Sequence, residues 1–253
     1  MTRPFLLLQL SDPHVGADWG PGDSVARLAA AVECARGVVP DPDAVLVSGD
    51  LADHADDAEY EQVRELLAPL GAPLYVLPGN HDRGRALRRH FDVPGADGRP
   101  VQYAADLGPL RLVVLDSTRP GEDPGELAAD RLEWLVTTLA AAPGTPTIVA
   151  LHHPPVATGI PLFDELGLRA ADRVALGRVV EGHPQVLRIL AGHAHRTIHG
   201  ELGGRSVLVV PSTYVQTALE FGAEEIRLSD EPRGFAVHAF VDGELVSHVQ
   251  AVG

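Results

Sequence analysis

Five short aliphatic runs, each followed at once by acidic, amide or imidazole side chains, restrict the fold of this 253-residue chain more than any other feature. The runs lie at 5–10, 44–47, 74–77, 147–151 and 186–191, and their composition is typical of buried strands. In open α/β sheets, sites form in the crevice beyond the carboxyl ends of the strands. We therefore expect five loops from one sheet edge to converge on a single point.

The residues that follow these strands are suited to binding metal ions. Together they offer enough oxygen and imidazole donors for two ions, and the carboxylate of Asp50 has two oxygens with which it could bridge a pair roughly 3.5–4 Å apart. Asn80 adds an amide oxygen without adding charge. The segments are Asp12-Pro13-His14, Gly49-Asp50, Gly79-Asn80-His81-Asp82, His152 and Gly192-His193-Ala194-His195.

The rest of the chain predicts an α/β protein with two sheets. Helical patterns cover 24–38, 57–70, 83–90, 128–141 and 173–181, and a hairpin covers 101–105 and 110–115. Short strands at 196–202, 206–210, 224–228, 235–241 and 244–252 indicate a mainly antiparallel C-terminal sheet. Because both sheets need a covered face, we expect a single domain over 1–253: a mixed two-sheet β-sandwich flanked by helices, in four αββα layers. The irregular stretch 154–171 is either a substrate-side loop or a surface loop.

Composition excludes several classes of function. The net charge is -15, and all 20 cationic residues are arginine, so binding of extended nucleic acid is disfavoured. Nothing approaches the roughly 18 apolar residues of a membrane span. Cys34 is the single cysteine, which excludes an intrachain disulfide. We expect a cytoplasmic protein that does not bind membranes.

Charge also indicates the chemistry of the site. Two divalent ions against the carboxylates of Asp12 and Asp50 leave about two positive charges, which suits a small anionic substrate whose phosphate oxygens are hard donors. A metal-bridging water of lowered pKa could attack phosphorus in line. His81 could then donate a proton to the leaving oxygen, with Asp82 fixing its tautomer.

The ordered motifs D-x-H, G-D, G-N-H-D, H and G-H-x-H resemble those of the calcineurin-like metallophosphoesterase superfamily and span positions 12 to 195. The resemblance implies that His81 is the catalytic histidine. It also implies two ions, for which Mn, Fe, Co and Zn suit the donors equally. One ion would be held by Asp12, His14, Asp50 and His195, and the other by Asp50, Asn80, His152 and His193.

Finer features favour one branch of that superfamily. The pieces at 151–155, 159–164, 191–195 and 211–213 are similar to those of class III cyclic nucleotide phosphodiesterases and bacterial glycerophosphodiesterases, although Tyr214 replaces their usual cysteine. We expect hydrolysis of a small phosphodiester, with a cyclic nucleotide first and a glycerophosphodiester second. A metal-binding regulatory protein without catalysis is the alternative from another class. Related enzymes commonly associate, which leaves a homodimer open.

Several residues near the motifs have two interpretations. Asp53 is either a substrate-side carboxylate or a helix cap, and Arg83 and Arg196 are either phosphate contacts or surface residues. His153 is equally open. The remaining histidines are interpreted as structural or surface residues: His54, His90, His183, His199, His238 and His248.

Overall fold

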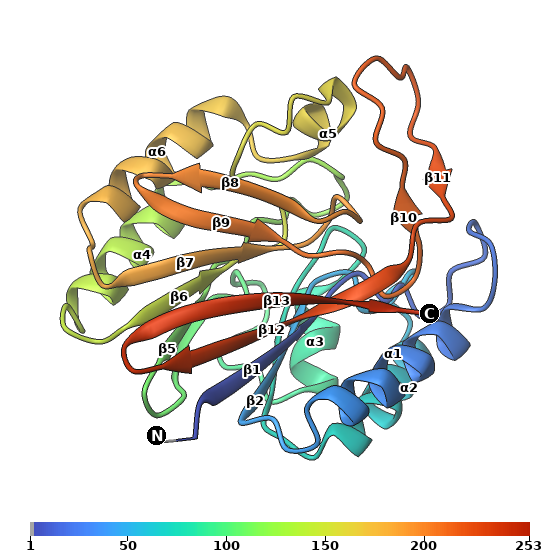
Figure 1. Cartoon of the computed structure of the whole chain (residues 1–253). Coiled ribbons are helices and arrows are strands. Elements are labelled where there is room, and N and C mark those ends of the chain that lie inside the picture. The colour runs from blue at the N-terminus through green and yellow to red at the C-terminus, as the bar shows by residue number, and fades with distance from the viewer. Residues whose placement is uncertain (1–2) are drawn as a thin grey trace.

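Two large β-sheets lie face to face in the computed structural model, which describes residues 3–253 (Figure 1). The first sheet has the order β13-β12-β1-β2-β3, and the second has the order β4-β5-β6-β7-β9-β8. The first sheet contains β1 (Phe5–Leu10), β2 (Ala44–Ser48), β3 (Leu74–Leu77), β12 (Arg233–Val241) and β13 (Glu244–Val252). The second contains β4 (Tyr103–Asp106), β5 (Arg111–Val114), β6 (Thr147–Ala150), β7 (Val186–Ala191), β8 (Ile198–Leu202) and β9 (Arg205–Val209). A separate pair joins β10 (Gln216–Thr217) to β11 (Leu228–Ser229).

Helices cover the outer face of each sheet (Figure 1). Beside the first sheet lie α1 (Ser24–Val38), α2 (Asp57–Leu67) with a 3-10 turn at Ala68–Leu70, and α3 (Gly84–His90). Beside the second lie α4 (Ala129–Ala140) and α6 (Ala170–Glu181), and the short α5 (Pro161–Leu166) precedes α6. These layers confirm the predicted two-sheet αββα architecture.

Strict alternation along the strands builds the two faces. On β5, Leu112 and Val114 belong to the core shared by the two sheets, whereas Val113 packs with the residues of α4 and α6. Successive side chains on a strand point to opposite faces, so a strand covered on both sides is apolar throughout. This explains why the strands preceding the polar segments are continuous aliphatic runs.

The predicted C-terminal antiparallel sheet is wrong. Instead, β8 and β9 extend the second sheet, where β9 runs parallel to β7, and β12 and β13 extend the first, where β12 runs antiparallel to β1. Two-residue turns form as the sequence indicates, with positive φ at Gly203, Gly204, Asp242 and Gly243. The turn residues correctly predict these two hairpins, but they do not predict which sheet each hairpin joins.

Three segments differ from their predicted conformation or bounds. The strand predicted at 224–228 is mostly turn and irregular chain, and only Leu228–Ser229 pairs, with β10. The stretch 154–171 contains α5, which starts on Pro161 at a position that tolerates proline. The helix predicted at 173–181 also begins earlier, at Ala170.

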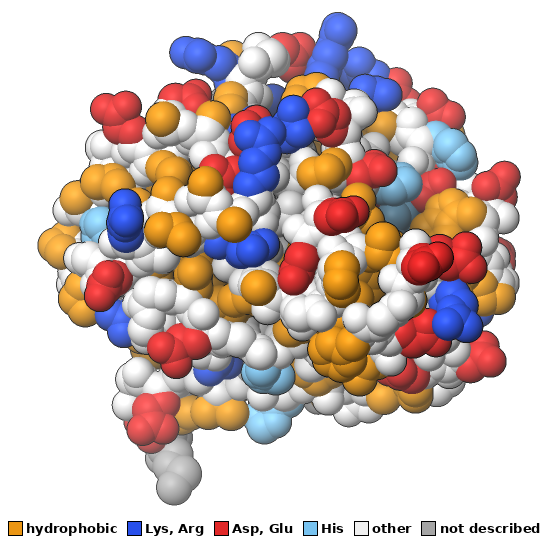
Figure 2. All heavy atoms as spheres, turned by 90° about the horizontal axis from the view of Figure 1, so that it is seen from above, with side chains coloured by type: hydrophobic (Ala, Val, Ile, Leu, Met, Phe, Trp, Pro, Cys, Tyr) orange, Lys and Arg blue, Asp and Glu red, His pale blue; other side chains and the backbone are white. Residues whose placement is uncertain are grey.

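The surface is mixed in character. Acidic, basic and hydrophobic side chains are interspersed over the face in Figure 2. Within residues 3–253, no helix is long and apolar enough to cross a membrane.

Candidate metal centre

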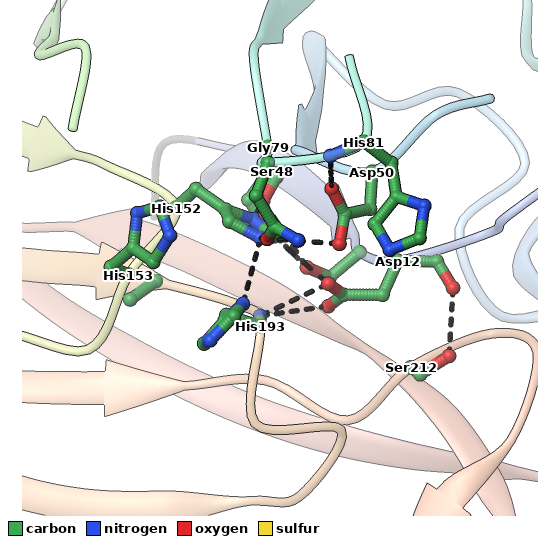
Figure 3. Close-up of polar contacts among 12 residues, drawn as sticks. Asp12, Ser48, Asp50, Gly79, His81, His152, His153, His193 and Ser212 are labelled. Atoms are coloured by element: carbon green, nitrogen blue, oxygen red, sulfur yellow. Dashed lines mark hydrogen bonds and ion pairs between the residues drawn. The ribbon is translucent and has the colours of Figure 1, made fainter. Parts of the chain in front are cut away.

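The polar segments converge from two sheets rather than one. Asp12, Asp50 and Asn80 follow β1, β2 and β3 of the first sheet, while His152 and His193 follow β6 and β7 of the second. The prediction that one sheet edge supplies all five loops is therefore wrong. The carboxyl ends of both sets of parallel strands open at the same end of the sandwich, so the side chains still meet (Figure 3).

The backbone is strained where the candidate ligands lie. Positive φ angles occur at Asp12, His14, Asp50, His193 and His195. Such conformations cost about 1–3 kcal/mol each in residues other than glycine, and they gather at functional sites. Asp and His tolerate this region better than most residues do. The sharp turns aim the side chains inward from the strand ends.

Two glycines allow the loops to approach each other closely. A Cβ on Gly49, whose φ is +98, would lie 2.2 Å from Nδ1 of His152, and one on Gly79 would lie 2.1 Å from Oδ1 of Asp50. Neither position can hold a side chain without moving a candidate ligand. The glycines in the G-D and G-N-H-D motifs are therefore steric requirements of the site.

The first group of donors surrounds His14. Its Nε2 lies 3.1 Å from Nε2 of His195 and 3.5 Å from Oδ2 of Asp50. Asp12, His14 and His195 each offer a ligand atom, all within 4.8 Å of one another. Asp12, His14 and Asp50 are at most 2% exposed.

The second group surrounds His152. Its Nε2 lies 3.2 Å from Oδ1 of Asn80, 3.2 Å from Nδ1 of His193 and 3.3 Å from Oδ2 of Asp50. Asp50 therefore contacts both groups through one carboxylate. Figure 3 shows Asp12, Asp50, His152 and His193 pointing toward one another.

These distances fit bound cations. Ligand atoms about 2.0–2.1 Å from a metal stand about 3–3.4 Å apart at common coordination angles. The Nδ1 atom of His152 donates to the carbonyl oxygen of Ser48 at 2.8 Å, and Nδ1 of His14 faces Oδ1 of Asp53 at 2.9 Å. The Nε2 atoms of both rings thus point at other acceptors, an arrangement that needs positive charge between them.

Electrostatics show the same requirement. Burial raises the pKa of Asp12 to about 6. Burial opposes ionisation of Asp50 as well, but the imidazole of His152 outweighs it and holds the pKa of Asp50 well below its usual range. Burial lowers the pKa of His152, yet Asp50 overcomes this effect and raises it to about 9. A metal ion would replace the proton that Asp50 holds on His152.

Two other imidazoles, those of His193 and His195, are neutral and can therefore bind a metal ion. Burial, reinforced by nearby His152, lowers the pKa of His193 to about 3. Burial also lowers the pKa of His195 well below its usual range. Neutral imidazole is the form that binds metal.

His81 stands beside the two groups without being enclosed by them. Its side chain is 33% exposed, its backbone N–H donates to Oδ1 of Asp50 at 3.0 Å, and its Nδ1 donates to the carbonyl oxygen of Asp53 at 2.9 Å. Because a carbonyl only accepts, the proton on Nδ1 is fixed and Nε2 is left for the cavity.

The prediction that Asp82 fixes the tautomer of His81 is wrong. Asp82 accepts from the backbone N–H groups of Gly79 at 2.9 Å and Leu51 at 3.2 Å, and from the hydroxyl of Tyr60 at 3.0 Å. Its carboxylate therefore ties the loop after β2 to the loop after β3. The tautomer of His81 is set by a backbone carbonyl, which no side-chain pattern could reveal.

The three predicted substrate contacts lie in different surroundings. Asp53 has a side chain 5% exposed and accepts from Nδ1 of His14 and Nε1 of Trp19, both at 2.9 Å. Arg196 pairs with Glu231 through both of its terminal nitrogens, at 3.1 and 2.9 Å. Arg83 is exposed and lines a second cavity beside His81.

His153 has both ring nitrogens occupied. Nε2 donates to the carbonyl oxygen of Asp123 at 2.9 Å, so Nδ1 accepts from the hydroxyl of Ser117 at 2.9 Å. Although it lies close to His152 and His193, it has no lone pair left for a metal. The structure resolves the ambiguity of this histidine in favour of a structural role.

A cavity of about 230 Å³ opens over the two groups. Besides candidate ligands and His81, its lining includes residues that the motifs did not reveal: Trp19, Asp123, Phe163, Leu166, Thr217, Ile226 and Leu228. Phe163 and Leu166 lie in the 154–171 stretch that the sequence singles out. The other residues fall in segments without a motif, where no local signal marks them.

Comparisons with known proteins agree with this geometry. A sequence model described as calcineurin-like phosphoesterase matches residues 5–197. The chain is 36% identical over 250 residues, 95% of its length and 78% of the relative's, to a cAMP/cGMP dual specificity phosphodiesterase of Mycobacterium tuberculosis. It is 28% identical to a probable glycerophosphodiester phosphodiesterase of Arcobacter nitrofigilis, covering 98% of this chain and 94% of that one. The crystal structure of a dimetal phosphatase from Danio rerio superimposes with a TM-score of 0.76 at 17% identity, covering 98% and 96% of the two chains.

Proposed function

Because the chain belongs to the calcineurin-like phosphoesterase family and is a metallophosphoesterase, we propose that it uses two metal ions to hydrolyse small phosphodiesters. The preferred substrate in this proposal is a cyclic nucleotide such as cAMP. The observation that carries the proposal is the meeting of two donor groups on Asp50, with His81 beside them.

The donor set suits two transition-metal ions. We assign Asp12, His14, Asp50 and His195 to one ion, and Asp50, Asn80, His152 and His193 to the other, on the distances given above. When bound, the ions would supply Lewis acidity to the phosphate oxygens and lower the pKa of bound water. Mn, Fe, Co and Zn all fit these donors.

The residues of the chain perform the remaining tasks. Hydrolysis adds water across the P–O bond of the diester, so the departing alkoxide needs a proton. Protonated His81 can supply it from Nε2, because Nδ1 is held by the carbonyl of Asp53. Asp53 also orients His14. The products are a phosphomonoester and an alcohol, which stay one molecule when the diester is cyclic.

The walls of the metal-site cavity favour a nucleotide. Trp19, Phe163, Ile226 and Leu228 give it an apolar and partly aromatic lining above the donors. Such a lining can take the face of a base, and base–aromatic stacking contributes about 1–3 kcal/mol. A glycerol arm would leave it uncovered. The mycobacterial relative, named for cAMP and cGMP, supports the same choice.

A glycerophosphodiester remains the second candidate, because the Arcobacter relative named for that activity matches nearly the whole chain. A metal-binding regulatory protein without catalysis is the alternative that the experiment must exclude. A homodimer and a cytoplasmic location also remain predictions.

The test is hydrolysis by the Mn-loaded protein of 3',5'-cyclic AMP, 2',3'-cyclic AMP, glycerophosphocholine and a nitrophenyl phosphate monoester, each with a chelated control. We expect metal-dependent turnover of a cyclic nucleotide well above that of the monoester. Faster turnover of glycerophosphocholine would select the second candidate. Absence of turnover with two metals bound would favour the non-catalytic alternative.

A further inference from the structure

A second cavity, of about 390 Å³, adjoins the metal centre and is lined by arginine. Asn80 and His81 form part of the wall of both cavities. A group bound in the second cavity would therefore lie next to the reacting phosphate. The arginines that line it are Arg83, Arg85, Arg88, Arg99, Arg119 and Arg131.

The cavity is positively charged in a chain whose net charge is -15. Against its six arginines stand two lining carboxylates, Asp82 and Asp116. Asp82 is committed to backbone N–H groups and Tyr60, and Asp116 accepts from the backbone N–H of Val101 at 2.7 Å and from Thr118. Asp116 also lies 3.7 Å from the guanidinium of Arg131 and neutralises it. Because Arg85 and Arg119 pair with carboxylates too, the positive charge of the cavity rests on Arg83, Arg88 and Arg99.

One of the arginines, Arg88, is fixed without losing its charge. Arg88 donates to the carbonyl oxygens of Gly84, Pro94, Arg99 and Pro100, at 3.0 to 3.5 Å. Carbonyl oxygens orient a guanidinium but carry no formal charge to cancel it. Arg88 thus leaves a positive field in the cavity.

Two arginines retain free donors. Among residues 3–253, no side chain or carbonyl accepts a hydrogen bond from the guanidinium of Arg83 or of Arg99. Arg119 and Arg85 differ from them, because Arg119 pairs with Glu122 and Glu126 and Arg85 pairs with Asp97. Arg83 and Arg99 are both exposed on the cavity wall, so they can reach a ligand.

We propose that this arginine-lined cavity is a phosphate-binding subsite that holds a second phosphate group of the substrate. The inference rests on the proposed function, because it places the scissile diester at the metal centre. Planar guanidinium forks match phosphate oxygens in pairs, and such charge-assisted bonds are about twice as strong as neutral ones. Among cyclic nucleotides, the favoured substrates then carry a further phosphomonoester, as a 2',3'-cyclic nucleotide with a 5'-phosphate does.

The test measures binding without turnover. Adenosine 5'-monophosphate and adenosine 3',5'-bisphosphate differ by one phosphate, and neither contains a diester. Calorimetric titration of the Mn-loaded protein should give a dissociation constant about tenfold lower for the bisphosphate. In Arg99→Gln the two constants should become equal, while Arg178→Gln, which removes an exposed arginine of α6, should keep the preference.

Each alternative outcome has a defined meaning. Equal affinity of the two compounds for the wild-type protein, or an unchanged preference in Arg99→Gln, overturns the subsite. A parallel titration with inorganic phosphate distinguishes the source: a binding event lost in Arg99→Gln without any bisphosphate preference would assign the cavity to free phosphate and overturn the substrate assignment. If the diester panel fails but the bisphosphate preference holds, the proposed function fails and the phosphate subsite stands.

Discussion

Two clusters of mostly buried polar side chains lie next to each other in this fold and differ in how their hydrogen bonds are satisfied. One is the metal centre. We term the other the Gln9–His238 cluster. Gln9 on β1 and Ser48 on β2 precede the ligands Asp12 and Asp50 by three and two residues, and His238 and Ser247 lie on the neighbouring β12 and β13.

Every link in the Gln9–His238 cluster pairs a donor with an acceptor. Ser247 donates to Nδ1 of His238 at 2.6 Å, Nε2 of His238 donates to Oε1 of Gln9 at 2.9 Å, and Nε2 of Gln9 donates to Ser48 at 2.8 Å. In the metal centre, by contrast, the Nε2 atoms of His14 and His195 face each other at 3.1 Å, and Nδ1 of the buried His195 has no partner among residues 3–253.

The comparison shows that burial alone does not distinguish a ligand histidine from a structural one. His152 and His238 are both fully buried. His238 has one partner for each nitrogen, whereas three possible metal ligands, on Asn80, His193 and Asp50, crowd Nε2 of His152 at 3.2 to 3.3 Å. Buried polar groups are almost always paired, so a cluster in which donors are missing marks the place where a cation belongs.

The largest effect should come from removing the carboxylate shared by the two donor groups. In Asp50→Ala we expect loss of bound metal and a fall in kcat/KM of at least about a thousandfold, because several kcal/mol of metal-derived stabilisation disappear. Metal content by mass spectrometry and diester hydrolysis measure both effects. The chelated wild-type protein, which should recover on adding Mn, is the control. Activity within tenfold of wild type would contradict the shared role of Asp50.

The next effect concerns proton donation. In His81→Ala we expect kcat/KM for a cyclic nucleotide to fall about 10²–10⁴-fold while both metals remain bound. A nitrophenyl leaving group needs no proton, so hydrolysis of bis(nitrophenyl) phosphate should fall much less. His54→Ala, which removes an exposed imidazole paired with Glu59, is the matched control. Loss of metal in His81→Ala would instead make His81 a ligand, as its proximity to His14 and Asp50 allows.

The sequence predicts what depends on local order and misses what depends on distant pairing. The five strands and the order of the donors follow from aliphatic runs and the residues behind them. The sheet that β12 joins depends on pairing Phe5 with Phe240, and no local pattern encodes that contact. The acceptor for His81 is a main-chain carbonyl, and the apolar cavity wall comes partly from 226–228, where a strand was predicted.

A smaller effect should follow from changing Asp53, which hydrogen-bonds to the candidate metal ligand His14. In Asp53→Asn we expect metal affinity to fall about tenfold or more, because an amide holds Nδ1 of His14 more weakly than a carboxylate does. Competition with a chelator measures it. Glu59→Gln, which removes the neighbouring carboxylate from His54, should leave metal affinity unchanged. A raised KM with unaltered metal affinity would support the substrate-side interpretation of Asp53 instead.

The smallest effect on catalysis should come from His238→Gln, which should instead change how the stability of the fold depends on pH. Burial, together with Arg188 and His248, lowers the pKa of His238 to about 3, so the folded protein holds it neutral. An unfolded histidine titrates near 6.5, and stability is therefore lost as the pH falls below that value. Between pH 7.5 and pH 5 this loss amounts to about 2 kcal/mol, and the variant, which cannot titrate, should lack it.

Glutamine retains an N–H for Gln9, so kcat/KM at pH 7.5 should stay within about twofold of wild type. Urea unfolding of the metal-loaded proteins at the two pH values measures the stability difference, and His199→Gln, at an exposed position on β8, is the control. If His238→Gln loses bound metal, the two clusters are not separate, because the chain of hydrogen bonds from His238 through Gln9 reaches Ser48, whose carbonyl orients His152. If it keeps its metal and loses only its pH dependence, the pairing of each nitrogen, and not burial, separates the structural histidine from the ligands.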